Sequence, residues 1–271
     1  MGRVDGKVAV ISGAARGQGR AHAIKMAEEG ADVVAFDICA GFSYTRHAPA
    51  TLEELEQTRK EVEQRGQRCI ARQLDARDLP GLEQLANDTM GEFGRVDILI
   101  VNHGIWVVDR NSWELPAESW QESIDVMLTG AWNVQKAFMP KIIESGRGGS
   151  VVFTSSTNGI IAQPGAVAYC VAKAGLLMMT KVLAHEVGPH DIRVNAVSPG
   201  RVDSQLIEGG TFEYSLENWP EYFGHGARIL LGGDPKRPPS VISDAVIWLV
   251  SDEAKYVTGA NIPVDSGRLI W

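Results

Sequence analysis

Short runs of β-branched and other apolar residues recur along the chain, and longer segments of helical pattern separate them. The runs are KVAVIS (7–12), DVVAFD (32–37), CIARQL (69–74), DILIV (97–101), SVVFTS (150–155) and IRVNAVS (192–198). Strands that alternate with helices form a parallel sheet, and strands that are apolar throughout need helices on both faces of that sheet. We therefore predict a doubly wound parallel α/β sheet with helices on both faces.

Length and composition favour a single domain over residues 1–271. The chain is 44% hydrophobic and 22% charged and has a net charge of -8, and α/β folds of this size are commonly single. The acidic balance predicts no nucleic-acid or anionic-membrane partner, and no run approaches the length of a membrane span. An odd number of cysteines and no recognisable targeting signal in MGRVDGKVAVISG favour reduced thiols and a cytoplasmic location.

Two helices can be outlined from their patterns. The segment GQGRAHAIKMAEEG (17–30) places Ala21, Ile24 and Ala27 on one face, which we expect to be buried, and a helix there should end at Gly30. Thr51 and Glu54 have the spacing of a capping box at the start of the next helix.

Two segments interrupt the alternation. Residues 38–50, ICAGFSYTRHAPA, are too long for a simple strand-to-helix turn and are interpreted as an insertion near the site. Residues 204–240 mix Gly, Pro and aromatic residues without a steady period. Their aromatic side chains favour a substrate lid over a mobile surface excursion; these are Phe212, Tyr214, Trp219, Tyr222 and Phe223.

A glycine-rich loop follows the first predicted strand and opens a helix. In SGAARGQGR the glycines Gly13, Gly17 and Gly19 allow a tight turn and a close approach of a pyrophosphate to the helix N-terminus. Asp37 ends the second strand 18 residues after Gly19, near the spacing of an acid that binds the adenosine ribose. This context predicts a Rossmann-type dinucleotide site.

The charge on Asp37 favours NAD over NADP because a carboxylate repels a 2′-phosphate. Arg16 acts in the opposite direction, since an arginine beside the loop could pair with that phosphate. We expect the carboxylate to decide, because a long flexible arginine moves aside more easily.

A second motif carries the chemistry. YCVAK places Tyr169 and Lys173 four residues apart on one helical face, and Ser156 ends the preceding strand. A tyrosine holds its proton until about pH 10, so it works as a base near neutrality only beside a cation, for which Lys173 is the candidate. Ser156 would hold the substrate oxygen while Tyr169 transfers the proton and a nicotinamide exchanges the hydride.

The whole chain resembles the short-chain dehydrogenase/reductase family. SGAARGQG is similar to the family loop T-G-x-x-x-G-x-G, VNHG (101–104) to N-N-A-G, YCVAK to Y-x-x-x-K, and SPGRVDS (198–204) to its P-G-x-x-x-T segment. The resemblance implies Ser156, Tyr169 and Lys173 as catalytic residues and no metal. The expected cofactor-binding residues are Gly13, Arg16, Gly17, Gln18, Gly19, Asp37, Asp75, Ala76, Asn102, Gly104, Tyr169, Lys173, Pro199, Gly200, Val202 and Ser204.

The insertion narrows the resemblance. An irregular stretch after the ribose acid, followed by TLEELEQTRKEVEQRGQRCIARQLDARD, is similar to the carveol-type dehydrogenases of actinobacteria that are linked to the peptide-derived redox carrier mycofactocin. That similarity implies NAD covered by the insertion so that it does not exchange freely, with the carrier as a partner. It also implies a homotetramer built on the helices around 117–139 and 167–186.

Two residues depart from the family pattern. Met127 stands in DVMLTG (125–130) where the family carries an asparagine that helps to hold a water beside the catalytic lysine. Methionine donates nothing and accepts weakly, but the resemblance implies that the main-chain carbonyl binds this water, so we expect slowed or rerouted proton transfer. His103 replaces the family alanine; a packed or solvent-facing histidine is favoured over a substitute polar group in catalysis.

The leading functional hypothesis is an NAD-dependent oxidoreductase that interconverts a secondary alcohol and a ketone. The aromatic residues of 204–240 indicate an apolar substrate, and only the resemblance suggests a cyclic or terpenoid-like one. The alternatives are an NADPH-using 3-oxoacyl reductase and, because of Met127, a catalytically silent NAD-binding regulator. The terminal Trp271 is expected to pack at a subunit contact.

Overall fold

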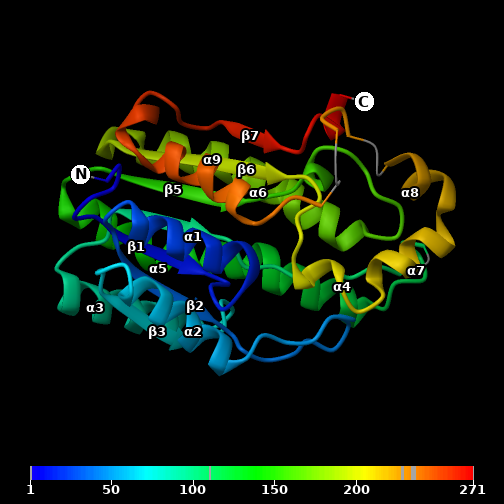
Figure 1. Cartoon of the computed structure of the whole chain (residues 1–271), viewed down its shortest axis with the longest axis horizontal. Helices are drawn as coiled ribbons and strands as arrows, with labels where there is room; N and C mark the ends of the chain where they lie inside the picture. Colours follow the sequence, from blue (N-terminus) through cyan, green and yellow to red (C-terminus); the bar gives the residue numbers. More distant parts are fainter. Residues whose placement is uncertain (1, 110, 227–228, 233–235, 271) are drawn as a thin grey trace.

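The strands of the computed structural model form one parallel sheet at the centre of the molecule (Figure 1). The structure describes residues 2–109, 111–226, 229–232 and 236–270. The sheet order is β3-β2-β1-β4-β5-β6-β7. The strands are β1 (Val8–Ser12), β2 (Asp32–Asp37), β3 (Cys69–Gln73), β4 (Ile98–Val101), β5 (Gly149–Thr154), β6 (Ile192–Pro199) and β7 (Asn261–Val264). The six predicted runs are confirmed as strands to within about one residue.

Helices cover both faces of this sheet, as predicted. One face carries α1 (Gly17–Glu28), α2 (Leu52–Glu63) and α9 (Ser240–Val250), which pack together in Figure 1. The other carries α3 (Leu79–Phe93), α5 (Gly130–Ser145) and α6 (Val167–Val187). The short helices α4 (Ala117–Ile124), α7 (Thr211–Asn218) and α8 (Pro220–Gly226) lie beyond the carboxyl ends of the strands.

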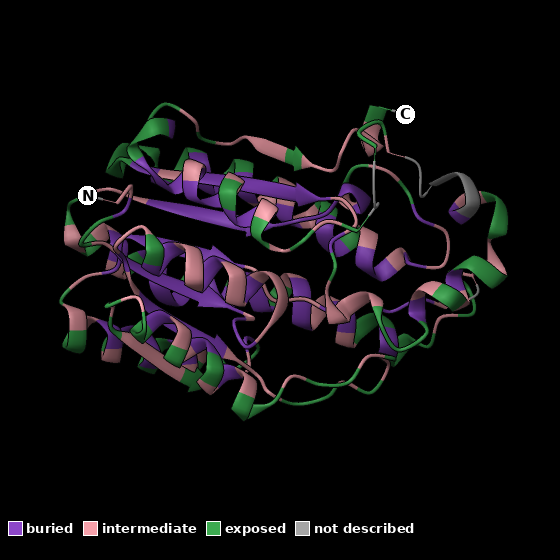
Figure 2. Ribbon diagram, viewed as in Figure 1, coloured by how far each residue is buried: buried purple, intermediate pink, exposed green. Residues whose placement is uncertain are grey.

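The strands are apolar along their whole length because helices cover both faces of the sheet. Figure 2 shows the central strands as buried between half-buried helices, and every residue of β1 and β4 is buried. One hydrophobic cluster fills each side of the sheet.

The buried face of α1 differs from the predicted one. Ala21 and Ile24 are only half-buried, and the face toward the core carries His22, Ala23 and Met26. A histidine fits there because its Nδ1 lies 2.8 Å from Ser243 Oγ of α9. Ala27 is buried as expected, but the prediction was wrong for Ala21 and Ile24, because apolar spacing alone does not foresee a polar residue whose partner lies on another helix.

Local signals placed the start of α2 correctly. Glu54 N–H donates to Thr51 Oγ1 at 3.2 Å, and Thr51 N–H donates to Glu54 Oε2 at 2.9 Å. This reciprocal pair is the predicted capping box.

The strand order reverses between β1 and β4. Loops that leave the carboxyl ends of these two strands diverge to opposite faces of the sheet, and the crevice between them is where doubly wound folds bind ligands.

One helix of the described residues, Val167–His190, is long and apolar enough to cross a membrane by length and composition. The expectation that no run approaches this length was therefore too strict. The helix belongs to the core, because it packs against β6 and β5 and buries Tyr169 and Lys173.

The segment 204–240 is more regular than its sequence indicates. It contains a short 3-10 turn (Gln205–Ile207) and the helices α7 and α8. The pattern was hard to recognise because the two helices are only 8 and 7 residues long, which is too short to establish a period.

Candidate active site

Two connected pockets open at the carboxyl ends of the strands. Gln18, Asn102, Gly104 and Ser204 line both of them, so the pockets form one continuous cleft. We call the part beside β1 and β2 the cofactor cleft and the part beside Tyr169 the substrate cavity. The cofactor cleft contains the predicted residues Gly13, Arg16, Gly17, Gln18, Asp37, Asp75, Ala76, Asn102, Gly104 and Ser204. The substrate cavity contains the predicted residues Gln18, Asn102, Gly104, Ser156, Tyr169, Lys173, Pro199, Gly200, Val202 and Ser204.

Gly19 is the one predicted cofactor residue that lines neither pocket. A Cβ atom on Gly19 would lie 2.0 Å from the carbonyl oxygen of Gly13. Gly19 therefore allows the first turn of α1 to pack onto the loop after β1, which is a structural requirement of the site.

Asp37 is fixed at the end of β2 and faces the cofactor cleft. Its Oδ2 accepts from Ala15 N–H at 3.1 Å, and its Oδ1 accepts from Cys39 N–H at 3.1 Å. Burial raises the pKa of Asp37, and the two backbone hydrogen bonds oppose that rise.

Arg16 is bound to the insertion 38–50. Its guanidinium donates to Ala48 O at 2.5 Å and to Pro49 O at 3.2 Å, and it lies 3.7 Å from Glu54 Oε2. The carbonyl groups of the insertion thus bind the guanidinium of Arg16, which is the group that would otherwise be available to pair with a 2′-phosphate.

The insertion also contacts the segment 204–240. Gly209 packs so closely on Arg46 that a Cβ atom would lie 2.2 Å from the Arg46 carbonyl oxygen, and the φ of Gly209 is +73°. The Arg46 guanidinium lies 4.2 Å from the ring centroid of Tyr214 in α7. Residues far apart in sequence therefore join above the cleft.

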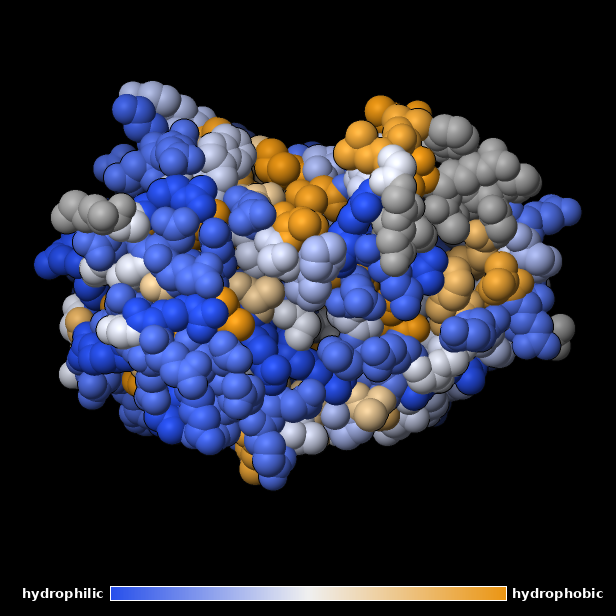
Figure 3. Space-filling view, in the orientation of Figure 1, coloured by the Kyte–Doolittle hydropathy of each residue, from blue (hydrophilic) through white to orange (hydrophobic). Residues whose placement is uncertain are grey.

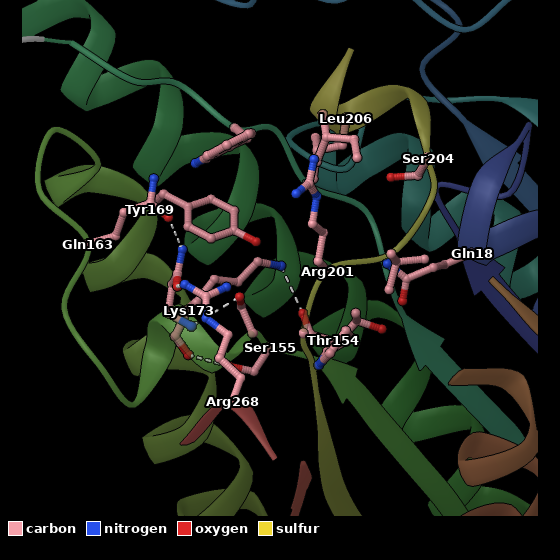
Figure 4. A pocket seen from close by; sticks show the side chains of 18 of the residues that line it. Gln18, Thr154, Ser155, Gln163, Tyr169, Lys173, Arg201, Ser204, Leu206 and Arg268 are labelled. Atoms are coloured by element: carbon pink, nitrogen blue, oxygen red, sulfur yellow. Dashed lines mark hydrogen bonds between the residues drawn. The ribbon is translucent and has the colours of Figure 1, made fainter. Parts of the chain in front are cut away.

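The predicted catalytic side chains come together in the substrate cavity, as Figure 4 shows for Tyr169 and Lys173. Tyr169 and Lys173 are buried on one face of α6. Ser156 begins a 3-10 turn after β5, and its Oγ accepts from Asn158 N–H at 3.1 Å. The serine oxygen is the acceptor in that contact, and the serine hydroxyl also hydrogen-bonds with Tyr169.

Lys173 Nζ donates to Thr154 O at 2.8 Å and lies 5.8 Å from the ring centroid of Tyr169. Burial lowers the pKa of Lys173 to about 8.

The electrostatics of Tyr169 differ from the simple expectation. Burial is the largest influence and raises its pKa, while a hydrogen bond with Ser156 and the charge of Arg268 lower it. Desolvation of the phenolate prevails because the tyrosine is only 8% exposed.

Asn102 connects the ends of three neighbouring strands. Its side-chain amide donates to the carbonyl oxygens of Ser12 and Gly13 at 3.4 and 3.3 Å, and its Oδ1 accepts from Thr154 Oγ1 at 3.2 Å. This network holds the loops after β1, β4 and β5 in register around the cleft.

His103 supports a π-helical turn, Asp125–Thr129, between α4 and α5. Gly130 N–H donates to the Asp125 carbonyl five residues back, so it does not reach the Val126 carbonyl. His103 Nε2 lies 3.1 Å from that carbonyl, and Nδ1 lies 2.7 Å from Ser12 Oγ. A carbonyl only accepts, so Nε2 carries the proton and Nδ1 accepts from the serine hydroxyl.

Desolvation, followed by the charge of Lys173, lowers the pKa of His103 to about 4. His103 is therefore neutral near pH 7 and holds the backbone at the π-helical turn. His103 is thus packed and hydrogen-bonded, and it also lines the cofactor cleft; whether it takes part in catalysis stays a prediction.

Met127 lies within this turn and is 1% exposed. It packs in a hydrophobic cluster that includes Tyr169, Ile105 and Ala172. The methionine thus contributes packing beside the catalytic tyrosine.

Several residues of the substrate cavity were not predicted from the sequence: Trp106, Asn158, Gln163, Arg201 and Arg268. No spacing rule points to them, because they lie on loops whose paths depend on tertiary contacts. The sequence signal that could have indicated two of them is their position, since Trp106 and Asn158 each follow soon after the end of a predicted strand.

Known proteins resemble the chain over its full length. A family model described as "Enoyl-(Acyl carrier protein) reductase" matches residues 13–268. The (-)-trans-carveol dehydrogenase of Rhodococcus erythropolis is 41% identical over 276 residues, with 100% of both chains covered. An NAD-dependent oxidoreductase of Mycobacterium tuberculosis is 41% identical over 269 residues, which cover 99% of this chain and 98% of the relative.

A solved structure shares the fold closely. The crystal structure of carveol dehydrogenase from Mycobacterium avium in complex with NAD superposes with a TM-score of 0.94 at 39% identity, covering 100% of both chains. Together with the glycine loop, the serine, the tyrosine and the lysine around one cleft, these similarities show that the chain belongs to the short-chain dehydrogenase/reductase family.

Proposed function

We propose that the protein is an NAD-dependent dehydrogenase that interconverts a secondary alcohol and a ketone. The observation that carries this proposal is the meeting of Ser156, Tyr169 and Lys173 in a cavity that is continuous with the cofactor cleft. Relatives and structural neighbours are described as NAD-dependent or bound to NAD, which supports the same cofactor here.

The cofactor cleft has the features that NAD requires. Among the described residues, three buried polar atoms that lack a partner belong to residues lining it, namely Gln18 Oε1, His47 Nε2 and Gln205 Oε1. Asp37 places a carboxylate where the adenosine ribose would lie, at the end of β2, and Arg16 is already bound to the insertion. Both features favour NAD over NADP.

The catalytic side chains then have distinct tasks. Bound NAD would accept or return the hydride. Ser156, held by Asn158 N–H, donates its hydroxyl proton to the substrate oxygen and orients it. Tyr169 takes the alcohol proton during oxidation and returns it during reduction. Lys173, buried and protonated below its pKa of about 8, stabilises negative charge that develops on the tyrosine.

Met127 need not abolish this proton transfer. The π-helical turn changes the backbone hydrogen bonding beside Lys173, and a main-chain carbonyl can bind a water whatever its side chain. We therefore propose a working catalyst with slowed or rerouted proton exchange with solvent.

The cavity walls favour a substrate with an apolar, cyclic body. Leu206, Ile207, Phe212 and Phe223 line the cavity, and the rings of Phe212 and Phe223 meet edge to face at 5.8 Å. We propose that the segment 204–240 acts as a substrate lid.

We further propose that the insertion retains NAD between turnovers. Arg16 ties the insertion to the glycine loop, and Arg46 ties it to α7. A retained cofactor needs an external acceptor to reoxidise it, which supports coupling to a peptide-derived redox carrier.

We propose a homotetramer in the cytoplasm. The outer faces of α5 and α6 expose apolar residues, with Trp132 43% and Met178 59% exposed, and an exposed apolar patch favours association. Figure 3 shows an apolar patch near the C-terminus. Leu231, whose N–H donates to Ser266 O, is 66% exposed, and Ile270 is 80% exposed. The predicted subunit contact of Trp271 lies outside the described residues.

The other two hypotheses have less support. An NADPH-using 3-oxoacyl reductase lacks a free arginine at position 16 for the 2′-phosphate, because the insertion binds it. A silent regulator would not need the three catalytic side chains assembled in one cavity.

The decisive experiment uses the purified protein without added cofactor. Bound NAD is assayed, and nicotinamide absorbance is then followed with cyclic secondary alcohols, with and without free NAD. Reduction of bound NAD once, with turnover restored by an artificial acceptor but not by free NAD, supports the retained-cofactor proposal. Steady turnover with free NAD supports an ordinary dehydrogenase, and no reduction of NAD by any alcohol contradicts the proposed function.

A further inference from the structure

The charged side chains among the described residues that line the substrate cavity are all cations. Lys173, Arg201 and Arg268 line it, and the described lining residues include no aspartate or glutamate. A cleft lined by charge of one sign attracts ligands of the opposite sign. The cavity is therefore suited to an anion, and apolar residues such as Leu206, Ile207 and Phe212 line the rest of it.

Arg268 is the cation whose surroundings are best defined. It lies in the 3-10 turn Arg268–Ile270 after β7, and Figure 4 shows it among the side chains around the cavity. Its guanidinium donates to Asn158 Oδ1 at 3.2 Å. No carboxylate of the described residues lies within 4.0 Å of Arg268, whereas other arginines such as Arg3 do have such a partner.

The carboxylate nearest in sequence is already used. Asp265 Oδ1 accepts from Gly267 N–H and Oδ2 accepts from Leu269 N–H, both at 2.9 Å. Asp265 therefore shapes the C-terminal turn, while Arg268 keeps its charge directed elsewhere.

The same cavity holds further donors without acceptors. Among the described residues, Arg268 Nε, Gln163 Nε2 and Trp106 Nε1 are buried and have no hydrogen-bond partner. Leaving a buried donor unsatisfied costs free energy, and a buried charge costs more. Three donors and no free carboxylate call for a ligand rich in acceptors.

We propose that the substrate carries a carboxylate, separate from its reacting carbinol or ketone carbon, and that Arg268 binds this group. The inference rests on the proposed function, because it names the substrate class of the same site. The substrate would be an apolar, cyclic hydroxy or oxo carboxylic acid whose ring contacts Leu206, Ile207 and Phe212. A planar guanidinium binds a carboxylate in a defined orientation.

Arg268 also connects to the catalytic serine. Asn158 accepts from Arg268 through Oδ1 and donates from its backbone N–H to Ser156 Oγ. A carboxylate bound to Arg268 would thus be positioned through Asn158, the same residue that holds the serine that orients the substrate oxygen. Arg268 is accordingly a specificity-determining residue.

The test compares an acid with its neutral analogue in two assays on the full-length, NAD-loaded protein. Calorimetry measures binding of the unreactive probes cyclohexanecarboxylate and cyclohexanecarboxamide. Kinetics measures kcat/KM for 3- and 4-hydroxycyclohexanecarboxylate and for the matching carboxamides. Wild type is expected to favour the acid by about 10- to 100-fold in both assays. In Arg268→Met the acid-to-amide ratio should fall close to one, mainly through KM.

Arg147→Met is the matched control, because Arg147 is exposed near the opposite end of the sheet and lines neither part of the cleft. It should keep the wild-type ratio. Arg268→Lys retains charge without the planar fork, so it should keep part of the preference if Arg268→Met misfolds.

Two results would overturn the inference: wild type binding the acid no better than the amide, or Arg268 variants keeping the acid preference. If neither alcohol is oxidised while cyclohexanecarboxylate binding depends on Arg268, the anion site stands and the proposed function fails. If neutral alcohols are oxidised without any acid preference, the proposed function stands and the anion site fails.

Discussion

Replacing Arg16 with methionine should release NAD faster without improving the use of NADP. The guanidinium donates to the carbonyls of Ala48 and Pro49 and is the side-chain link between the glycine loop and the insertion. Methionine keeps much of the apolar stem and removes all donors. The substitution therefore tests the anchor and not the volume of the side chain.

The magnitude follows from those two hydrogen bonds. A hydrogen bond from a charged donor contributes about 1.5 to 3 kcal/mol. Both hydrogen bonds are exposed to solvent, and water competes for the exposed donor, so we take the lower end for the anchor as a whole, about 1.5 kcal/mol. A factor of ten corresponds to about 1.4 kcal/mol, so the NAD dissociation rate should rise about tenfold.

The assay loads the protein with NADH and follows the loss of bound-nicotinamide fluorescence after mixing with excess NAD. Arg72→Met is the control, because Arg72 pairs with Asp88 on an exposed surface outside the cleft. An unchanged dissociation rate in Arg16→Met would refute the anchoring role. A large loss of NADP affinity would instead show that Arg16 binds the 2′-phosphate.

Three further predictions concern catalysis, cofactor choice and acid stability. Tyr169→Phe should lower kcat by about 10²- to 10⁴-fold while NAD still binds in calorimetry; an unchanged kcat would exclude Tyr169 as the acid-base residue. Asp37→Asn should raise the NADP-to-NAD ratio of kcat/KM by about tenfold or more because a repulsive charge is lost, and a constant ratio would contradict that role. Burial lowers the pKa of His22 from 6.5 to about 3. The stabilisation that neutral His22 provides is therefore complete above pH 6.5 and is lost as the pH falls toward 3. In urea unfolding, the free energy of unfolding of the wild type should fall by about 2 kcal/mol between pH 7 and 5. His22→Gln should reduce that loss, and an identical loss would assign it to other groups.

Most of the sheet could be predicted because six of its seven described strands carry their own signal, and only β7 was not among the predicted runs. Continuous apolar runs such as DILIV indicate that both faces of the sheet are covered by helices, and the alternation of strands with helices indicates that the strands are parallel. The capping box at Thr51 and Glu54 was equally local, since both partners lie within one turn.

The active-site motifs were recognisable for a related reason. Tyr169 and Lys173 share one helix, and the glycine loop spans a single strand-to-helix turn, so short spacings describe their geometry. The structure then adds what the spacing does not contain, namely that burial outweighs other influences on the pKa of Tyr169.

Other features depend on contacts between distant segments. His22 can be buried because its ring Nδ1 hydrogen-bonds with Ser243 Oγ. The position of His103 is explained by the hydrogen bond of its Nε2 with the Val126 carbonyl. Arg268 enters the cavity from the far end of the chain. No local pattern encodes such pairings, so the sequence could not assign these residues.

The contact between Arg46 of the insertion and Tyr214 of α7 links the two parts of the cleft. If the insertion and the segment 204–240 close over the cleft as proposed, closure of one biases closure of the other. Thermodynamic reciprocity requires that, if substrate binding strengthens NAD binding by some factor, NAD strengthens substrate binding by the same factor. Weakening this one contact should therefore reduce, by the same factor, the increase in affinity that each ligand gives the other, because the two ligands share a single coupling free energy.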